Sequence, residues 1–558
     1  MKENIDAGGK MENLWSKYFL KPDHSNLQGA VDQIATALKG LSEHFGLSPM
    51  YPKHKGIPSI DQIIAGAELP QDYDSDPGKT LKKLGDYLQG SVKAGHPFMV
   101  KNIIPTVSLP YLSAYFASST LMANAVTGED AGQILLAEIS TVAEISKLAG
   151  LDANLSGGVF TFGGTGTNLY GLKIGLTKVD SESHSKGITR PIACVESAPS
   201  HYCHATAVDW LGIGTDNLIR VKSNLNQTTN VQELKSACRG AIEQGKRIAC
   251  ITVLGGTTSN MGIDNIKEIA DIRNSLVKDY SLDYSPHIHA DAVLGWAFLV
   301  FRDYDFTLNP LGFSAKTIDQ LQKIAERMDT LRYADSFGVD FHKLGFMPYT
   351  SSVFIVKNRE DLKLLRRDAD IMTPLFHDDE AYNPGKYTLE TSRSAANILA
   401  TWMSMNMLGK DGYRLLLGHS LEMGDVCRDE IIRNQPAGLH IANEEFFGPD
   451  VFVRCYPPGV DPEATYREEL NNDQLLLKHS KYITQFANWM EKEGVPFQEE
   501  GIALSRSSAA IYTNTGRPMV ALRIYPLSPF MQEEHAVELI QRIVRYKKLF
   551  DGENQAIK

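Results

Sequence analysis

The stretch Ala334-Asp-Ser-Phe-Gly-Val-Asp-Phe-His-Lys-Leu-Gly-Phe346 places one lysine, Lys343, behind a histidine and among apolar side chains. The stretch contains no other lysine or arginine. Two interpretations are open. Such a lysine usually buries its stem and keeps its ammonium in water. Less often the amine is desolvated, its pKa falls, and it becomes a nucleophile for a carbonyl. Two other segments of the chain favour the second interpretation.

The composition limits the kinds of partner to expect. The chain has 558 residues, a net charge of -11 at pH 7 and no basic cluster with interleaved aromatics, so we expect no nucleic-acid partner. No apolar run reaches the length of a membrane span, and the first residues lack the apolar core of a secretion signal. The six cysteines form no Cys-x-x-Cys pair, which is typical of reduced thiols. The sequence therefore predicts a cytoplasmic protein without a membrane partner.

A glycine-rich segment follows a short apolar run. Residues 157–168 read Gly-Gly-Val-Phe-Thr-Phe-Gly-Gly-Thr-Gly-Thr-Asn, and an apolar helix is predicted directly afterwards. Glycines let backbone N–H groups approach an anion, and a helix N-terminus adds partial positive charge. Neither the Walker nor the dinucleotide pattern fits. A phosphate cradle that includes Thr165, Gly166 and Thr167 and a purely structural turn both remain open.

Apolar strands alternate with helices in the middle of the chain. We predict strands at 191–196, 248–254 and 287–293, and each is followed by small polar residues. This pattern is typical of a mostly parallel sheet covered on both faces. Ligands bind such sheets at the carboxyl ends of the strands. The residues at or near these ends include His201, Thr257 and Asp291.

The organisation changes after residue 395. A strand is expected at 351–356, a long helix after Ser392, and then an α+β region with strands at 450–455 and 519–524 and a closing helix. No repeat or low-complexity segment is visible. We predict three parts, namely an N-terminal helical segment over residues 1–118, a large domain over 119–395 and a small α+β domain over 396–558.

These features share one economical chemical use. Pyridoxal 5'-phosphate needs a lysine for its Schiff base, an anion opposite the pyridine nitrogen and an anchor for its phosphate. Asp291 could keep that nitrogen protonated, and His201 could stack on the ring. The glycine-rich segment could hold the phosphate, with His342 close by. We therefore predict a pyridoxal-phosphate site.

Four motifs carry a resemblance to a known family. They are Gly163-Gly-Thr-Gly-Thr-Asn168, Ser200-His-Tyr-Cys-His204, His289-Ala-Asp-Ala292 and the stretch from Asp335 to Lys343. Together they resemble the group II pyridoxal-phosphate-dependent amino-acid decarboxylases, which include glutamate, aromatic-amino-acid and diaminobutyrate enzymes. The resemblance covers residues 95 to 420. It implies a fold-type-I α/β homodimer with its active site at the subunit interface and an amino acid as substrate.

The resemblance also implies roles for individual residues. Lys343 resembles the Schiff-base lysine, Asp291 the partner of the pyridinium and His201 the ring-stacking residue. Arg393 matches an arginine that faces the substrate carboxylate in glutamate decarboxylases, and Asn102 lies in the segment that matches the wall of the substrate pocket.

A loop tyrosine is also implied. Tyr382 stands near the place of the family's catalytic-loop tyrosine, in a stretch from Asp368 to Leu389 whose composition suggests a mobile loop. Tyr387 is its competitor for the role of proton donor, and an ordinary exposed aromatic is the alternative for either residue.

Three departures from the family leave the substrate amino acid open. The gap between Asp291 and Lys343 is longer than usual, and its extra segment at 309–330 could be a lid or a dimer arm. Asp340 stands where many members have asparagine near the phosphate, and its carboxylate would repel a phosphate unless it points away. Val293 replaces a frequent alanine beside the ring.

Three other functions are alternatives to this prediction. His287-Ile-His289-Ala-Asp291 is a possible start of a metal-dependent hydrolase site, but nothing else in the sequence completes a ligand set. Cys203 and His204 likewise lack a fourth ligand, so no metal is expected. A carbon–carbon lyase acting on a phosphorylated amino alcohol, as in the sphingosine-phosphate lyases, would keep the cofactor. A non-catalytic relative would not need the intact lysine, aspartate and histidine. We predict an L-amino-acid decarboxylase.

Overall fold

The fold is that of a computed structural model, which describes residues 7–42, 46–52, 59–71, 80–81, 83–367 and 382–556. The chain forms two compact units, Met1–Lys93 with Met490–Ala503 and Ala94–Trp489 with Leu504–Lys558. The helices of the first unit's N-terminal stretch are α1 (Ala7–Tyr18), α2 (Leu27–Ser42), α3 (Ile60–Gly66) and α5 (Leu84–Tyr87).

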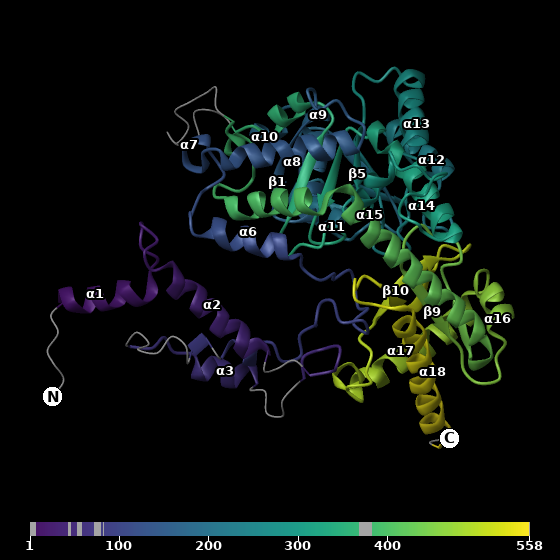
Figure 1. The fold of residues 1–558 in the computed structure, drawn as a ribbon. Helices are drawn as coiled ribbons and strands as arrows, with labels where there is room; N and C mark the ends of the chain where they lie inside the picture. The colour runs from purple at the N-terminus through teal and green to yellow at the C-terminus, as the bar shows by residue number, and fades with distance from the viewer. Residues whose placement is uncertain are drawn as a thin grey trace. The chain divides into compact units, whose positions relative to one another are not determined.

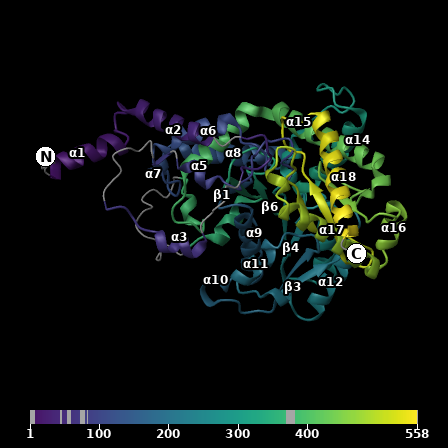
Figure 2. The same ribbon diagram turned by 90° about the horizontal axis from the view of Figure 1, so that it is seen from below.

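The second unit contains a seven-stranded sheet in the order β1-β7-β6-β5-β4-β2-β3. Figure 2 labels β1, β6, β4 and β3 of this sheet. The five strands from β6 to β3 are parallel, whereas β7 runs antiparallel to both β6 and β1. Every residue of β2, β5, β6 and β7 is buried, as continuous apolar runs predict for strands covered on both faces. The strands are β1 (Gly157–Thr161), β2 (Ile192–Ser197), β3 (Leu218–Val221), β4 (Arg247–Leu254), β5 (His287–Asp291), β6 (Ser336–Asp340) and β7 (Ser352–Val356).

Alternate side chains of these strands pack into different cores. Cys194 and Cys250 face one core together with Leu172 and Leu176 of α9. Val195, Ile251 and Phe337 belong to the other core, with side chains of α8, α12, α13 and α15. The sheet therefore separates α9 from the remaining large helices. The helices of this part are α6 (Leu109–Ser119), α7 (Gly128–Ala131), α8 (Ile134–Leu148), α9 (Gly164–Val179), α10 (Ser183–Lys186), α11 (Cys203–Trp210), α12 (Val231–Glu243), α13 (Ile266–Asp279) and α14 (Ala315–Met328).

A long helix leads from this sheet to a smaller one (Figure 1). It is α15 (Ala395–Arg433), and its non-helical backbone at Gly409, with φ 60°, marks a kink. The smaller sheet has the antiparallel order β10-β11-β9-β8. The strands of this sheet and the helices between and after them are β8 (Leu439–Ile441), β9 (Val451–Cys455), α16 (Pro462–Glu469), α17 (Asp473–Lys492), β10 (Ser505–Tyr512), β11 (Pro518–Ile524) and α18 (Glu533–Ala556).

The predicted fold class is confirmed: a mostly parallel sheet covered on both faces, with a smaller α+β region after it. The strands predicted at 191–196, 248–254, 287–293 and 351–356 correspond to β2, β4, β5 and β7. The domain boundaries at residues 118 and 395 remain predictions. In the extra segment at 309–330, α14 buries Leu321, Ile324 and Met328, so this helix packs in its own subunit.

Candidate active site

A cavity of about 350 Å³ lies beside the carboxyl ends of β4, β5 and β6 and the N-terminus of α9. Open α/β sheets bind ligands at this edge. Of the predicted site residues, those that line the cavity are Thr165, His201, Thr257, Asp291, His342 and Lys343.

Lys343 follows β6 and is paired with a buried carboxylate. Its Nζ lies 3.0 Å from Oδ2 of Asp340, and the lysine side chain is 18 % exposed. Burial lowers the pKa of Lys343, but the carboxylates of Asp340 and Asp291 outweigh burial and hold this pKa above its ordinary value. The apolar flanks of the lysine suggested a fall in pKa. The structure differs because Asp340 points toward the amine.

Asp340 is itself held in place by neighbouring side chains. Its Oδ1 accepts a hydrogen bond of 2.6 Å from the hydroxyl of Ser352, and Nε2 of His342 lies 3.5 Å from Oδ2. His342 also contacts the carbonyl oxygen of Ser351 through Nδ1 at 3.0 Å. Burial lowers the pKa of His342. The Asp340 carboxylate thus lines the cavity and forms an ion pair with the Lys343 amine.

Asp291 ends β5 and carries an oxygen that lacks a partner. Nδ2 of Asn168 and Nε2 of His204 each lie 3.3 Å from its Oδ2, whereas its buried Oδ1 has no hydrogen bond from any described residue. Burial raises the pKa of Asp291, but the contacts with His204 and Lys343 outweigh burial and keep that pKa below its ordinary value. An ionised oxygen on the cavity wall that lacks a donor fits the protonated ring nitrogen of pyridoxal phosphate.

His201 supplies a largely buried ring on the same cavity. Its Nδ1 accepts a hydrogen bond of 3.3 Å from the backbone N–H of Cys203, and its ring lies against that of Tyr202 with centroids 4.3 Å apart. Burial lowers the pKa of His201. A neutral imidazole in this position is suited to packing against a flat heterocycle.

The glycine-rich turn contributes only part of its predicted cradle. Gly163, with φ 107°, precedes α9, and Gly164 and Thr165 line the cavity. Gly166 and Thr167 belong to the first turn of the helix, where both N–H groups bond to the carbonyl of Gly163. The hydroxyl of Thr167 donates to Gly164, so neither residue offers a free donor to the cavity.

Thr257 lies on the cavity within a tight turn after β4. Its hydroxyl donates to the carbonyl of Ser259 and accepts from the backbone N–H of Gly262 at 2.8 Å. The side chain therefore stabilises the turn that forms this wall.

Besides Gly166 and Thr167, the predicted residues Arg393, Tyr382 and Asn102 are not among those that line the cavity. Arg393 is 8 % exposed and forms a bidentate contact with Glu138. The Tyr382 hydroxyl donates to the carbonyl of Gly158 at 3.2 Å, and Asn102 accepts from Arg523. The substrate-binding role of Arg393 and Asn102 and the proton-donor role of Tyr382 remain predictions. Residues 368–381 of the predicted loop lie outside the described residues.

Several residues on or beside the cavity were not singled out from sequence. Asn168 and His204 both contact Asp291. Tyr202 and Tyr349 are exposed aromatic residues that line the cavity. The closely spaced histidines of the Ser200–His204 motif were a usable signal for His204. No local pattern indicated the tyrosines.

The metal-site alternative is poorly supported by these contacts. His287 and His289 share the hydroxyl of Ser336 as a partner, each at 2.8 Å. Ligand atoms of Cys203, His204 and Asp291 lie within 4.8 Å of one another. However, the Asn168 amide donates toward Cys203 and Asp291, at 3.4 and 3.3 Å. These contacts suit a hydrogen-bonded network.

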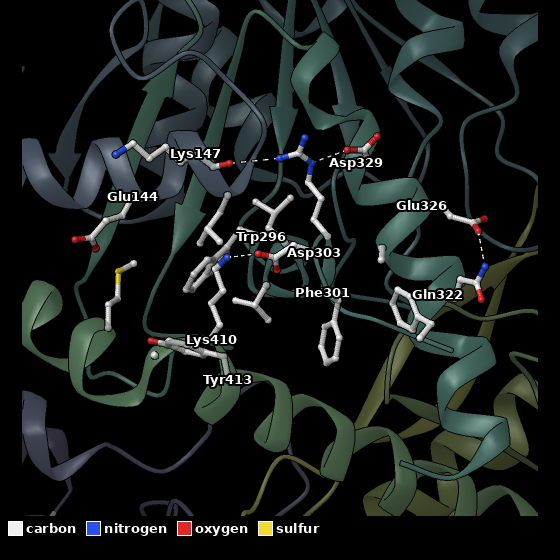
Figure 3. A pocket seen from close by; sticks show the side chains of 18 of the residues that line it. Glu144, Lys147, Trp296, Phe301, Asp303, Gln322, Glu326, Asp329, Lys410 and Tyr413 are labelled. Carbon is white, nitrogen blue, oxygen red and sulfur yellow. Dashed lines mark hydrogen bonds and ion pairs between the residues drawn. The ribbon is translucent and has the colours of Figure 1, made fainter. Parts of the chain in front are cut away.

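A larger cavity, of about 960 Å³, lies elsewhere, between α8, α14 and α15 (Figure 3). Four of its charged residues form ion pairs with each other: Arg302 contacts Asp329 at 2.6 Å, and Lys410 contacts Asp303. Trp296 and Tyr413 form part of its apolar wall. Because it has no partnerless buried anion beside a lysine among its described residues, we place the chemistry in the smaller cavity.

Comparison with known proteins agrees with this geometry. The profile of the family described as "Pyridoxal-dependent decarboxylase conserved domain" matches residues 66–453. The chain belongs to this family. It is a pyridoxal-phosphate-dependent carboxy-lyase that acts on an amino acid.

Individual relatives carry different substrate names. The chain is 25% identical over 398 residues to the L-2,4-diaminobutyrate decarboxylase of Rhizobium meliloti, covering 70% of each chain. It is 26% identical over 399 residues to the aspartate 1-decarboxylase of Aliivibrio fischeri, covering 68% of this chain and 65% of the relative. The crystal structure of mouse CSAD superposes with a TM-score of 0.74 at 18% identity, over 93% of this chain and 99% of the mouse chain.

Proposed function

We propose that Lys343 is the residue to which pyridoxal phosphate is attached and that Asp291 holds the proton on its ring nitrogen. The observation that carries the proposal is the partnerless Oδ1 of Asp291 on the same cavity as the Lys343 amine. A buried carboxylate oxygen without a donor is costly unless a ligand supplies one.

Bound pyridoxal phosphate supplies an electron-withdrawing ring that accepts the electrons of the bond broken at the substrate Cα. Asp291 keeps a proton at the ring nitrogen, where a fixed charge in a buried site acts strongly. The neutral imidazole of His201 packs on the ring. The N-terminus of α9, with Gly164 and Thr165, binds the phosphate. The Asp340 carboxylate contacts the Lys343 amine directly and favours its protonated form.

Borohydride reduction of the holoenzyme followed by peptide mapping tests this assignment. We expect the reduced cofactor on the peptide that contains Lys343, and no label in Lys343→Ala. Lys178→Ala is a matched control, because Lys178 is also a partly buried lysine paired with a carboxylate, Asp361, at 2.6 Å. Label on another lysine of the wild-type enzyme would contradict the proposal.

The substrate remains to be assigned within the L-amino acids. Release of CO₂ from a panel of acidic, basic and aromatic L-amino acids would identify it. The relatives are named for different amino acids of this panel, so their names do not identify the substrate of this chain.

We also propose that the enzyme is a homodimer with its cavities near the subunit interface. The backbone N–H of Ser108, at the start of α6, bonds to the carbonyl of Phe346, three residues after Lys343. From there α6 exposes Leu109, Leu112 and Tyr115, and Tyr349 of the cavity lining is 67 % exposed. Exposed apolar side chains at helical spacing, as on α6, are typical of an interaction surface.

Analytical ultracentrifugation tests the dimer. Leu112→Asp should yield monomers and lower activity. Leu477→Asp, at an exposed leucine of α17, should leave both the dimer and the activity unchanged. A dimer that survives Leu112→Asp together with Leu109→Asp would argue against this face.

The cytoplasmic location is likewise a proposal. It is supported by the six cysteines, all of which are free and buried. Among the described helices, none has the length and apolarity needed to cross a membrane. Fractionation of the native host cells would test the location.

A further inference from the structure

His204 on α11 lies between two buried carboxylates and is itself fully buried. Its Nδ1 is 2.8 Å from Oε2 of Glu196, and its Nε2 is 3.3 Å from Oδ2 of Asp291. The first contact is a hydrogen bond. The second is an ion-pair distance without good hydrogen-bond alignment.

Both ring nitrogens of His204 therefore carry a proton. An ionised carboxylate can only accept, and a neutral imidazole has a single N–H, so one of its nitrogens would direct a lone pair at a carboxylate oxygen. Burial lowers the pKa of His204, but Asp291 and Glu196 outweigh it and raise that pKa to about 9. The residue is an imidazolium at neutral pH.

The contacts continue from the imidazolium to the protein surface. Oε1 of Glu196 accepts a hydrogen bond of 2.6 Å from Nε of Arg220, whose side chain is 49 % exposed. Charges thus alternate along Arg220, Glu196, His204 and Asp291. The carboxylates of Glu196 and Asp291 together compensate the buried cation.

The remaining titratable groups around His204 are neutral. Burial lowers the pKa of His201, and it lowers that of His289 to about 3. Burial raises the pKa of the Cys203 thiol. The charges that face His204 are therefore those of Glu196 and Asp291.

We propose that His204 is a positioning residue that keeps the proton shared by Asp291 and the cofactor ring on the ring nitrogen. The inference rests on the proposed role of Asp291. The imidazolium contacts Oδ2 of Asp291, while Oδ1 is left for the ring. A cation beside a carboxylate makes that carboxylate a weaker base, so the shared proton stays on the nitrogen. Without the cation, the proton moves toward Asp291 and the ring becomes a weaker electron acceptor.

The position of this proton can be measured apart from activity. Holoenzyme would be reconstituted with pyridoxal phosphate labelled with nitrogen-15 in the ring, and the nitrogen chemical shift recorded at neutral pH. We expect a protonated-ring shift in the wild type and movement toward the unprotonated value in His204→Gln. Turnover should fall roughly tenfold or more, the effect of a one-unit change in relative proton affinity. An unchanged shift in folded His204→Gln would overturn the inference.

A second variant keeps the inference testable if His204→Gln does not fold. Glu196→Gln removes one of the two carboxylates that keep His204 charged. The ring shift of the wild type should stay constant above neutral pH and begin to move only as the pH approaches about 9, the pKa of His204. In Glu196→Gln the shift should begin to move at lower pH, since His204 loses its proton earlier. A response as flat as that of the wild type would overturn the inference.

Two further variants, His479→Gln and Asp291→Asn, show whether a change in the ring shift is specific to His204 and whether the role of Asp291 holds. His479→Gln removes another buried histidine–carboxylate contact, 2.6 Å from Glu469, away from the cavity, and should leave the ring shift unchanged. A change in His479→Gln equal to that in His204→Gln would count against a specific role for His204. If Asp291→Asn moves the ring shift and His204→Gln does not, the present inference fails while the proposed function stands. If neither moves it, the role of Asp291 fails too.

Discussion

Two ion pairs with a buried carboxylate, Lys343–Asp340 and Arg393–Glu138, differ in their surroundings. Arg393 also donates to the carbonyls of Ala125 and Phe160, at 2.8 and 3.2 Å, and Glu138 accepts from the N–H of Phe160 at 2.7 Å. Protein atoms therefore surround both partners. Lys343 has Asp340 as its ion-pair partner among the described residues, and it lies on an open cavity.

The difference predicts a structural role for the Arg393–Glu138 pair and a reactive role for the Lys343–Asp340 pair. A pair whose hydrogen-bonding groups all contact protein joins segments distant in sequence, as Arg393 joins α8 and β1. A pair that faces a cavity keeps one side available for a ligand. The resemblance implies a site role for both cations, so the contacts provide the contrast that mutations can test.

The largest contrast is expected between Lys343→Met and Arg393→Met. Lys343→Met should lower turnover by on the order of 10⁴-fold or more, because it removes the attachment point for the cofactor. It should lower the free energy of unfolding less than Arg393→Met does, because the Asp340 carboxylate that it leaves unpaired faces the cavity. Arg393→Met should lower the free energy of unfolding by about 3–5 kcal/mol, since it leaves the Glu138 charge buried and unpaired. Denaturant unfolding and steady-state kinetics of both variants measure the contrast. A stable Arg393→Met with a raised KM would instead support its substrate-binding role.

The proton donor of the mechanism comes next in expected size. Tyr382→Phe should slow amine formation by roughly 10²–10⁴-fold with the cofactor retained, if Tyr382 delivers the proton to Cα. Burial raises the pKa of Tyr382 well above its ordinary value and that of Tyr387 to about 12, so both hydroxyls are protonated at neutral pH. Product analysis should reveal some aldehyde in the defective variant. Normal amine formation in Tyr382→Phe, with Tyr387→Phe impaired, would transfer the role to Tyr387.

Replacement of the buried anion should have a strong but smaller effect. Asp291→Asn should retain the fold and some cofactor but lose roughly 10²–10³-fold in turnover, as removal of one fixed electrostatic contact typically does. Its absorbance spectrum would confirm that cofactor is bound. Near-normal rates would show that the Asp291 charge is not needed.

The smallest effect concerns the pH at which the lysine becomes reactive. Asp340 is the nearest of the carboxylates that hold the pKa of Lys343 above its ordinary value, and Asp291, His201 and Tyr349 also lie around the cavity. Asp340→Asn should therefore lower that pKa, and cofactor uptake by the cofactor-free enzyme should become fast at lower pH. Stopped-flow absorbance against pH measures this change.

A matched control exists for the pH experiment. Asp361→Asn breaks the pair with Lys178, which is remote from the cavity lining, and should leave the uptake profile in place. An identical profile for Asp340→Asn and the wild type would mean that Asp340 does not control the amine.

The sequence by itself indicated most strands of the large sheet, though not β3 or β6, and polar residues at or near the carboxyl ends of those strands. Continuous apolar runs and helical periodicity are local properties, so they indicated β2, β4, β5 and β7 without knowledge of the fold. His201 and Asp291 were indicated by their places at or near strand ends and Lys343 by its apolar flanks, and the structure places all three on one cavity.

Only the tertiary structure decided which side chains meet. The antiparallel pairing of β1 with β7 joins segments nearly two hundred residues apart, and no local period encodes that pairing. The same holds for Arg393 with Glu138, Asn102 with Arg523, and His204 with Asp291. Periodicity shows whether a residue faces the core, but a side chain's partner depends on how distant segments pack. Lys343 and Asp340 lie only three residues apart, but the hydroxyl of Ser352 on the neighbouring strand β7 holds the Asp340 carboxylate, and that contact exists only in the folded chain.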